Sequence, residues 1–273
     1  MHSQEQQATE CLSQKANDNY LKTHDTAEVL NPSSLYPVVM TIEHASPNTP
    51  SDIDLGVEPD ESTLPYFYDV GIPKVARHLA NDIGATTIFG RYTRLVIDLN
   101  RSIGRDDLIA ENEYWGIPIP GNTGLTQKDK DYRLNKYYTD YHKTISAHIQ
   151  RLRDNNIEPL YFSLHSYPRH ERTMDEPYPW DFACLYNEDN RMAKIFMDHI
   201  SENYPDVVIG DNEPYSLKEY QTGSAIEHGQ NNNLPYLLIE ISIDKMQTPE
   251  DIAFWSKLIR ECLEKSIEQI IQA

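Results

Sequence analysis

The stretch YPVVMTIEH at residues 36–44 places a run of mostly apolar side chains directly before a glutamate and a histidine. Such a run predicts a buried strand over residues 36–43. A charged group in a buried strand must be paired, bound to a metal or titrated, because burying an unpaired charge costs several kcal/mol. The stretch therefore predicts both the start of the core and the position of a polar site.

Strands and helices alternate from this stretch to the C-terminus. Helical spacing of apolar residues predicts a helix over residues 70–83 and another over 127–155. Further strands are predicted at 86–89, 94–99, 159–164, 182–186, 207–209 and 234–243, and further helices at 190–203, 224–230 and 249–271. The alternation predicts an α/β sandwich around a mixed, mainly parallel sheet.

The chain of 273 residues is long enough for one α/β domain, which we place at residues 34–273, although length alone also allows two small domains. Residues 1–33 are predicted to form a polar N-terminal arm. No apolar run approaches the roughly 20 residues of a membrane-spanning helix, and residues 1–30 lack the apolar stretch of a signal peptide. We therefore expect a soluble, cytoplasmic protein without a membrane partner.

Charge and cysteine content narrow the classes of partner. The 24 basic and 43 acidic residues give a formal net charge of -19. This charge repels phosphate backbones and argues against a nucleic-acid partner, whereas an acidic small molecule would need a local cationic pocket. Cys11, Cys184 and Cys262 are odd in number and widely spaced, which argues against a disulfide framework and predicts buried thiols.

Polar residues stand at the carboxyl ends of four predicted strands, where open α/β sheets bind their ligands. The four groups are Glu43-His44, Asp98-Asn100-Arg101, His165-Ser166 and Glu240. Two histidines and a carboxylate form the three-ligand set of a catalytic zinc site, which leaves a fourth position for water. We predict His44 and His165 as the histidine ligands, while His142, His148 and His170 lack metal-ligand spacing and are predicted to lie at the surface.

The third metal ligand is Asp69 or Glu43. Asp69 stands at a predicted helix start, where it could serve only as a helix cap. Glu43 precedes His44, and adjacent residues of a strand point to opposite faces, so the two can chelate together only if the strand has already ended. We therefore prefer Asp69.

Glu240, in the run LLIEIS, is the predicted general base, because a carboxylate beside metal-activated water can take its proton and pass it to the leaving nitrogen. Arg94, Asn100 and Arg101 are predicted to bind a substrate carboxylate or the oxyanion, since the planar guanidinium makes bidentate bonds to carboxylates. Structural alternatives remain: Glu240 could pair with a core arginine, and Arg94 with Asp98 or Glu43.

Five segments together resemble the N-formylglutamate amidohydrolase family over about residues 38–243. They are EHAS followed by Pro, D-x-G at 69–71, RLVIDLNRS at 94–102, a strand ending in HS and a late IEI. RLVIDLNRS is the most specific of these. The DLNR and HSY segments also resemble the zinc carboxypeptidases, although Pro47 stands where the glutamate of an HxxE motif would be.

The resemblance implies a three-layer α/β/α, metallopeptidase-like domain in which zinc-activated water hydrolyses N-formyl-L-glutamate or a close N-acyl amino acid. It implies His44, Asp69 and His165 as metal ligands, Glu240 and Arg94 as catalytic residues, and Asn100 and Arg101 as substrate-binding residues. The segment 212–229 resembles a family substrate loop, which adds Tyr215 and His228. Activity on another amide, a non-catalytic binding protein, and iron, cobalt or manganese in place of zinc stay open, as does the oligomeric state.

Overall fold

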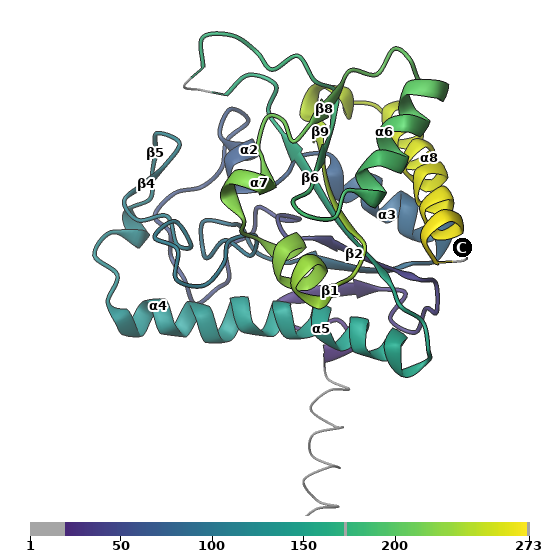
Figure 1. Ribbon diagram of the computed structural model, residues 1–273. Helices are drawn as coiled ribbons and strands as arrows, with labels where there is room; N and C mark the ends of the chain where they lie inside the picture. The colour runs from purple at the N-terminus through teal and green to yellow at the C-terminus, as the bar shows by residue number, and fades with distance from the viewer. Residues whose placement is uncertain (1–19, 172–173, 272–273) are drawn as a thin grey trace, which may run out of the picture.

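A seven-stranded mixed sheet is the centre of the computed structural model, which describes residues 20–171 and 174–271 (Figure 1). In spatial order its strands are β1 (Ala27–Leu30), β3 (Thr86–Gly90), β2 (Val38–Ile42), β6 (Leu160–Tyr167), β9 (Tyr236–Ser242), β7 (Phe182–Leu185) and β8 (Ile209–Asp211). Strands β3, β2, β6 and β9 run parallel, while β1 and the β7–β8 pair run antiparallel to them. The predicted mixed, mainly parallel sheet is confirmed.

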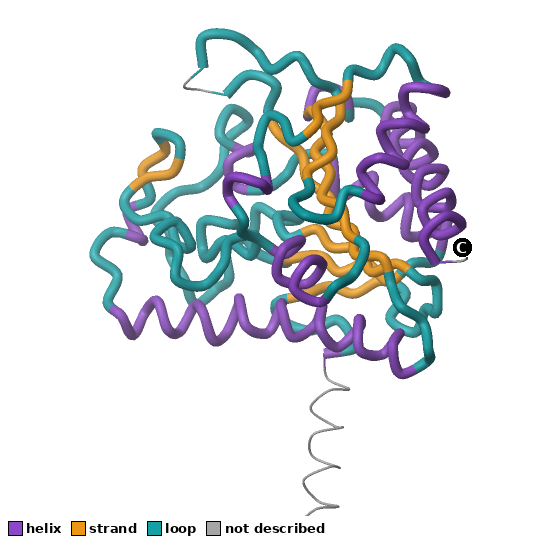
Figure 2. Tube along the Cα trace, viewed as in Figure 1, coloured by secondary structure: helices purple, strands orange, loops and turns teal. Residues whose placement is uncertain are grey.

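Helices cover both faces of the sheet, as Figure 2 shows. On one face α3 (Ile72–Ile83) and α6 (Arg191–Asn203) pack against α8 (Pro249–Ser266), and on the other lies α5 (Thr139–Asp154). The predicted α/β/α layering is therefore confirmed. Shorter elements are α2 (Leu64–Phe67), α4 (Gln127–Arg133), α7 (Leu217–Tyr220) and a two-stranded hairpin of β4 (Glu113–Tyr114) and β5 (Ile117–Pro118).

The central strands read as continuous apolar runs because both of their faces are buried. In β2 the side chains of Val38, Met40 and Ile42 enter the core under α3 and α8, while Val39 enters the core beside α5. Each fully buried side chain of this kind contributes about 1.5–3 kcal/mol to folding. The same alternation places Ser163 and His165 of β6 on the α5 face, where they adjoin the polar site.

Residues 94–99 do not form the predicted strand. Leu95, Val96 and Ile97 are buried, but their backbone turns and does not join the sheet. Side chains satisfy its carbonyl groups instead: the Asn122 amide donates to the carbonyl of Leu95 at 2.9 Å, and Arg133 donates to that of Val96 at 2.9 Å. Burial of this apolar run therefore required no sheet partner.

The N-terminal boundary also differs from the expectation. Ala27–Leu30 forms β1, an edge strand that pairs antiparallel with β3, so part of the predicted arm belongs to the sheet. Four residues carry too short a pattern to be recognised as a strand by periodicity. Residues 1–19 of the predicted arm, with Cys11, lie outside the described residues.

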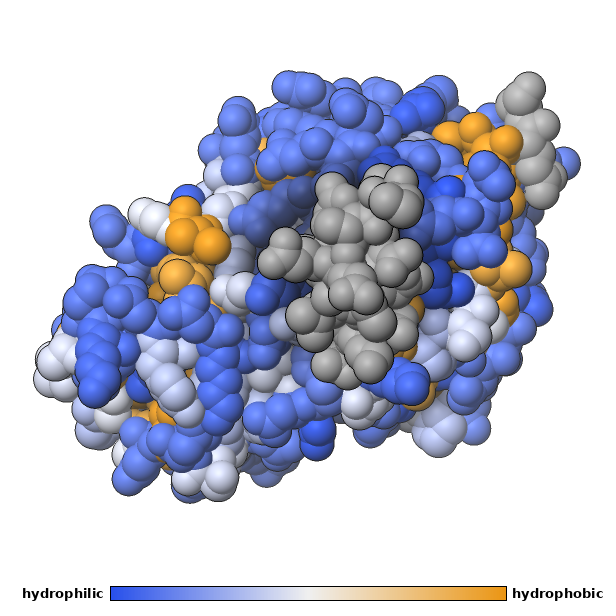
Figure 3. Space-filling view, turned by 90° about the horizontal axis from the view of Figure 1, so that it is seen from below, coloured by the Kyte–Doolittle hydropathy of each residue, from blue (hydrophilic) through white to orange (hydrophobic). Residues whose placement is uncertain are grey.

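The face seen from below, on the side of α4 and α5, is largely hydrophilic with small apolar patches (Figure 3).

Cys184 and Cys262 are buried free thiols, as predicted. None of the helices in the described part of the chain combines the length and apolar character that crossing a membrane requires.

Two histidines of α5, His142 and His148, are buried and not at the surface as predicted. His148 is fully buried, and neither ring nitrogen has a hydrogen-bond partner among the described residues. Burial, helped by the charge of Arg151, lowers the pKa of His148 to about 3. The helical period alone could not reveal this, because a polar residue on the inner face looks like an interruption of the stripe.

Stability is expected to fall in mild acid because of His148. Below pH 6.5 the unfolded chain binds a proton that the folded chain excludes, so the free energy of unfolding decreases as the pH falls toward the folded pKa. Between pH 7.5 and 5.0 this one group should cost about 2 kcal/mol. His148→Leu should remove that part of the acid slope in urea unfolding at the two pH values.

The control is His78→Leu on α3, where the side chain is 50% exposed. That variant should keep the acid slope of the parent. An unchanged slope in His148→Leu would show that the unfolded and folded chains protonate His148 alike.

Candidate active site

A cavity of about 380 Å³ opens at the carboxyl ends of β2, β6 and β9. It is lined by polar residues that the sequence singled out, together with a set of aromatic residues that it did not. The predicted residues at the cavity are His44, Asp69, Arg94, Asn100, Arg101, His165, Tyr215 and Glu240. The parallel strands therefore bring together segments that lie far apart in the chain.

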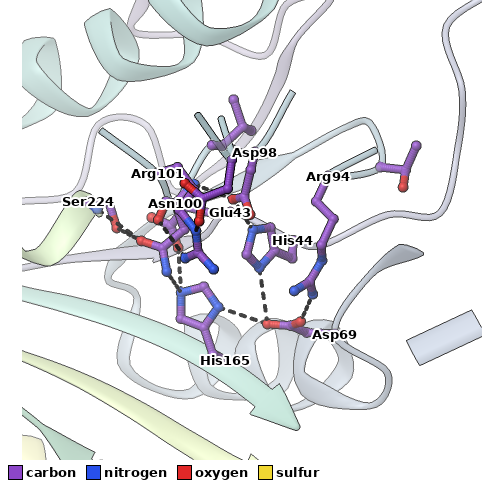
Figure 4. A network of polar contacts seen from close by, with 12 residues as sticks. Glu43, His44, Asp69, Arg94, Asp98, Asn100, Arg101, His165 and Ser224 are labelled. Carbon is purple, nitrogen blue, oxygen red and sulfur yellow. Dashed lines mark hydrogen bonds and ion pairs between the residues drawn. The ribbon is translucent and has the colours of Figure 1, made fainter. Parts of the chain in front are cut away.

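His44, Asp69 and His165 form a buried group whose candidate ligand atoms all lie within 4.8 Å of one another. The Nδ1 atom of His165 lies 2.8 Å from Oδ2 of Asp69, and the Nδ1 atom of His44 lies 3.6 Å from the same oxygen. Both imidazoles thus turn the same nitrogen toward one carboxylate (Figure 4).

The outer nitrogens of the two rings are held by two further buried carboxylates. Nε2 of His44 lies 2.6 Å from Asp98, and Nε2 of His165 lies 3.1 Å from Glu43. A carboxylate on one ring nitrogen fixes the proton there and leaves the other nitrogen available as a ligand, which is the arrangement that surrounds metal-bound histidines. Nδ1 of His44 is buried and has no hydrogen-bond partner in the described part of the chain, so the donor set fits a cation.

The electrostatics of the group favour positive charge between its carboxylates. Burial opposes protonation of His165, but hydrogen bonds to Asp69 and Glu43 raise its pKa to about 10. Burial likewise opposes ionisation of Asp69, but Arg94 and His44 hold the pKa of that carboxyl well below its ordinary value. A divalent cation bound by these residues would supply the same positive charge beside the carboxylates.

The two candidates for the third ligand lie beside different nitrogens of the His165 ring. Strand β2 ends at Ile42, so the opposite-face rule does not constrain Glu43 and His44. Glu43 nevertheless lies on the Nε2 side of His165, where Ser163 also donates to it at 3.0 Å. Burial alone would raise the pKa of Glu43, but the hydrogen bond to His165, the charge of His165 and hydrogen bonds to Thr41 and Ser224 together lower it to about 2.

Asp69 does not cap the following helix. The N-cap of α3 is Gly71, and no side chain caps that helix end. The Asp69 carboxylate instead contacts Arg94 and accepts from the backbone NH of Ser166 at 3.3 Å. The helix-cap alternative is therefore absent, and the carboxylate faces the two histidines.

Glu240 lines the same cavity, beside His165. The two residues are register partners in the neighbouring parallel strands β9 and β6. Oε2 of Glu240 is buried without a hydrogen-bond partner among the described residues, and burial raises the pKa of this carboxyl to about 8. An unpaired carboxylate of raised basicity at a cavity wall is suited to accept a proton.

The family model for N-formylglutamate amidohydrolase matches residues 36–246, which contain all the predicted site residues. The chain belongs to this family. It is therefore an amidohydrolase, an enzyme that hydrolyses an amide bond. No similar sequence was found among curated proteins.

Two solved structures share the amidohydrolase's fold. The gene product Atu2144 from Agrobacterium tumefaciens is 23% identical with a TM-score of 0.83, and the match covers 92% of this chain and 99% of that one. The N-formylglutamate amidohydrolase from Ralstonia eutropha JMP134 is 19% identical with a TM-score of 0.67, and the match covers 90% and 98%. At these identities the likeness concerns the fold.

The DLNR segment of the amidohydrolase contacts the outer nitrogens of both histidines, through Asp98 at His44 and Asn100 at His165. Asn100 Nδ2 lies 3.3 Å from Nε2 of His165, and its Oδ1 accepts from the backbone NH of Ser224 at 2.9 Å. A side chain on Gly223, whose φ is 96°, would collide with Asn100, so this close approach requires glycine. Arg101 pairs with Asp107 at 3.2 Å and keeps its side chain 32% exposed at the cavity.

The predicted substrate loop divides into two parts. Tyr215 lines the cavity and donates to Glu171, a buried residue that the sequence did not single out. His228 does not line the cavity: its Nε2 lies 2.7 Å from Nδ1 of His142, whose Nε2 lies 3.1 Å from the carbonyl oxygen of Leu99. These two histidines thus form a hydrogen-bonded chain beneath the DLNR turn.

Five aromatic residues that the sequence did not predict also line the cavity. They are Tyr66, Tyr114, Trp115, Tyr167 and Tyr220. Most of them come from loops and short elements with no periodic pattern, so only the composition of the EYWG segment at 113–116 could have drawn attention to them.

Proposed function

We propose that the chain hydrolyses the amide of a small N-acylated amino acid, with N-formyl-L-glutamate as the first candidate. The observation that carries the proposal is the buried His44, Asp69 and His165 group, whose His44 Nδ1 atom has no hydrogen-bond partner among the described residues, together with the Glu240 carboxylate in the same cavity. The family description supplies the substrate candidate.

We propose zinc as the metal, held by His44, Asp69 and His165. When bound, it supplies a Lewis acid for the scissile carbonyl and lowers the pKa of water to about 7. Two imidazoles and one carboxylate suit zinc, and the same ligands would accept iron, cobalt or manganese. Asp98 and Glu43 orient the histidines for this role through their outer nitrogens.

Glu240 is the proposed general base. Its carboxylate, which lines the cavity, takes a proton from the attacking water and then gives it to the leaving nitrogen, so that the amine departs neutral. Arg94 contacts Asp69, and its Nε is buried without a hydrogen-bond partner from residues 20–171 and 174–271. We propose that Arg94 holds Asp69 in place and that its guanidinium, which lines the cavity, also donates to the developing oxyanion.

Arg101, Asn100 and Tyr215 are the proposed substrate-binding residues. Arg101 is the more exposed of the two arginines at the cavity and can make a bidentate bond to the α-carboxylate of the substrate. Asn100 and Tyr215 belong to the same cavity lining as that arginine and Glu240. His228 keeps a supporting role through His142.

Metal analysis and amidase assays test the function together. Protein purified without chelator should contain about one equivalent of zinc per chain, the stoichiometry of a mononuclear site, and should release formate from N-formyl-L-glutamate. Chelation should abolish the release, and added zinc should restore it.

Other outcomes point to the other classes. Bound metal with activity only on N-acetyl or longer acyl amides would favour a different deacylase. Well-folded protein that neither contains nor takes up metal would exclude the hydrolytic mechanism and favour a binding protein.

A further inference from the structure

The tip of the β4–β5 hairpin places a tryptophan in an unfavourable backbone conformation. Tyr114 pairs with Ile117, so Trp115 and Gly116 are the two central residues of a tight turn. Their φ values are 50° and 74°. A turn with two positive φ values normally carries Asn-Gly, and a bulky residue such as tryptophan in this region is rare.

This conformation costs stability, a cost that the contacts of the indole offset. Residues in sparsely populated backbone regions gather at ligand-binding sites, where the surrounding structure holds them in place. Trp115 lines the active-site cavity, and its ring centroid lies 6.4 Å from that of Tyr66 and 6.5 Å from that of Tyr114. The strained residue therefore completes an aromatic wall, formed by Tyr66, Tyr114 and Trp115.

The charges at the cavity suit a substrate with a single carboxylate. Of the described residues that line it, only Arg94 and Arg101 carry a permanent positive charge, and both already contact aspartates. The lining also holds four acidic residues, Asp69, Asp107, Glu171 and Glu240. Even with a divalent cation bound, a second substrate carboxylate would lack a free cationic partner among these residues.

We infer that the preferred substrate is an N-acyl amino acid with one carboxylate and a large aromatic side chain, which stacks on the wall of Tyr66, Tyr114 and Trp115. This inference rests on the proposed amide hydrolysis and names its substrate class. Aromatic rings pack in offset or edge-on arrangements at the centroid distances found within the wall. The dicarboxylate N-formyl-L-glutamate, the first candidate named by the family, is then still hydrolysed in this site but less efficiently than an aromatic N-formyl amino acid.

A substrate series with a turn-preserving variant tests the inference. The zinc-loaded enzyme is assayed with N-formyl derivatives of phenylalanine, glutamate and glycine. Trp115→Asn removes the indole but supplies the residue that this turn favours, so the variant should fold with unchanged or raised Tm. Trp115→Phe retains an aromatic ring as the conservative comparison.

The parent enzyme should show a kcat/KM for N-formyl-L-phenylalanine at least about tenfold above that for N-formyl-L-glutamate. Trp115→Asn should lose about tenfold or more on the phenylalanine derivative and change little on the glycine derivative, while Trp115→Phe recovers part of the loss. Preference for the glutamate derivative, or an equal loss on all three substrates, would overturn the inference.

Binding gives an answer even without turnover. Calorimetry with the zinc-loaded Glu240→Gln variant measures the affinity of each N-formyl amino acid directly. Tighter binding of the phenylalanine derivative that depends on Trp115 would support the inference even if no substrate were hydrolysed, in which case only the proposed function fails. Equal or absent binding of all three would reject the inference by itself.

Discussion

Glu240→Gln is expected to lower kcat by a factor of about 10²–10⁴, with metal content and KM close to those of the parent enzyme. Glutamine has the shape of glutamate but cannot accept the proton of the attacking water. The carboxylate reaches the cavity from β9 and makes no hydrogen bond through Oε2 to the described residues, so its removal breaks no pairing of that oxygen. The loss should therefore appear in the chemical step.

The measurement is steady-state kinetics on the best N-formyl amino acid, with zinc determined on the same samples. Glu264→Gln, an exposed substitution on α8, is the matched control and should leave kcat unchanged. Near-native activity of Glu240→Gln would remove this residue from the proton transfer. Loss of zinc in that variant would instead make Glu240 part of the metal site.

A stability measurement separates a chemical role from a structural one. Burial raises the pKa of Glu240, so ionisation at pH 7.5 works against the folded metal-free chain, because the unfolded carboxyl ionises more readily. Neutral glutamine removes this penalty. The metal-free variant should therefore unfold at the same or a higher Tm than the metal-free parent.

Much of the fold could be predicted because the central strands are buried on both faces. Continuous apolar runs such as VVMTI and YLLIEIS predict buried strands without information from the rest of the chain. A charged residue inside or directly after such a run is easily recognised as a candidate site residue. The carboxyl ends of parallel strands converge, so His44, His165 and Glu240 could be placed together from sequence. Asp69 could be preferred over Glu43 from the residues alone, but only the resemblance favoured it over a helix cap, since a lone acid before a helix also suits a cap.

The features that could not be predicted depend on contacts between distant residues. Residues 94–99 have the composition of a strand, but the side chains of Asn122 and Arg133 satisfy their carbonyl groups in a turn. His142 is buried with a hydrogen bond to His228, 86 positions away. Trp115 lines the cavity although its turn, with a positive φ at this position, favours a residue such as asparagine. Residues whose backbone conformation does not suit their type are typical of functional sites.

Asp69→Asn is expected to weaken zinc binding by far more than Glu43→Gln, although both remove a buried carboxylate that contacts His165. Asp69 faces the Nδ1 atoms of both histidines, so its loss removes a proposed ligand. Glu43 holds the outer nitrogen of one ring, and a residue that only orients a ligand typically changes metal affinity by about 10–100-fold.

The two variants are compared by zinc content after purification without chelator and by competition with a chromogenic chelator. The amide side chains keep the shape of the carboxylates they replace, and the amide oxygen introduced by Asp69→Asn can still accept a hydrogen bond from Arg94. Circular dichroism and Tm should confirm folding, because a buried arginine that loses its charged partner can destabilise the chain by about 3–5 kcal/mol.

The comparison decides which carboxylate is the ligand because the two oxygens lie on opposite sides of one imidazole ring. If Asp69 binds the metal, Glu43→Gln retains stoichiometric zinc with a dissociation constant raised about 10–100-fold, and Asp69→Asn exceeds that range. If Glu43 binds it, the order reverses, and His165 must present Nε2 and not Nδ1 to the ion. Equal, small effects in both variants would mean that neither carboxylate is a ligand and that His44 and His165 bind the ion without them.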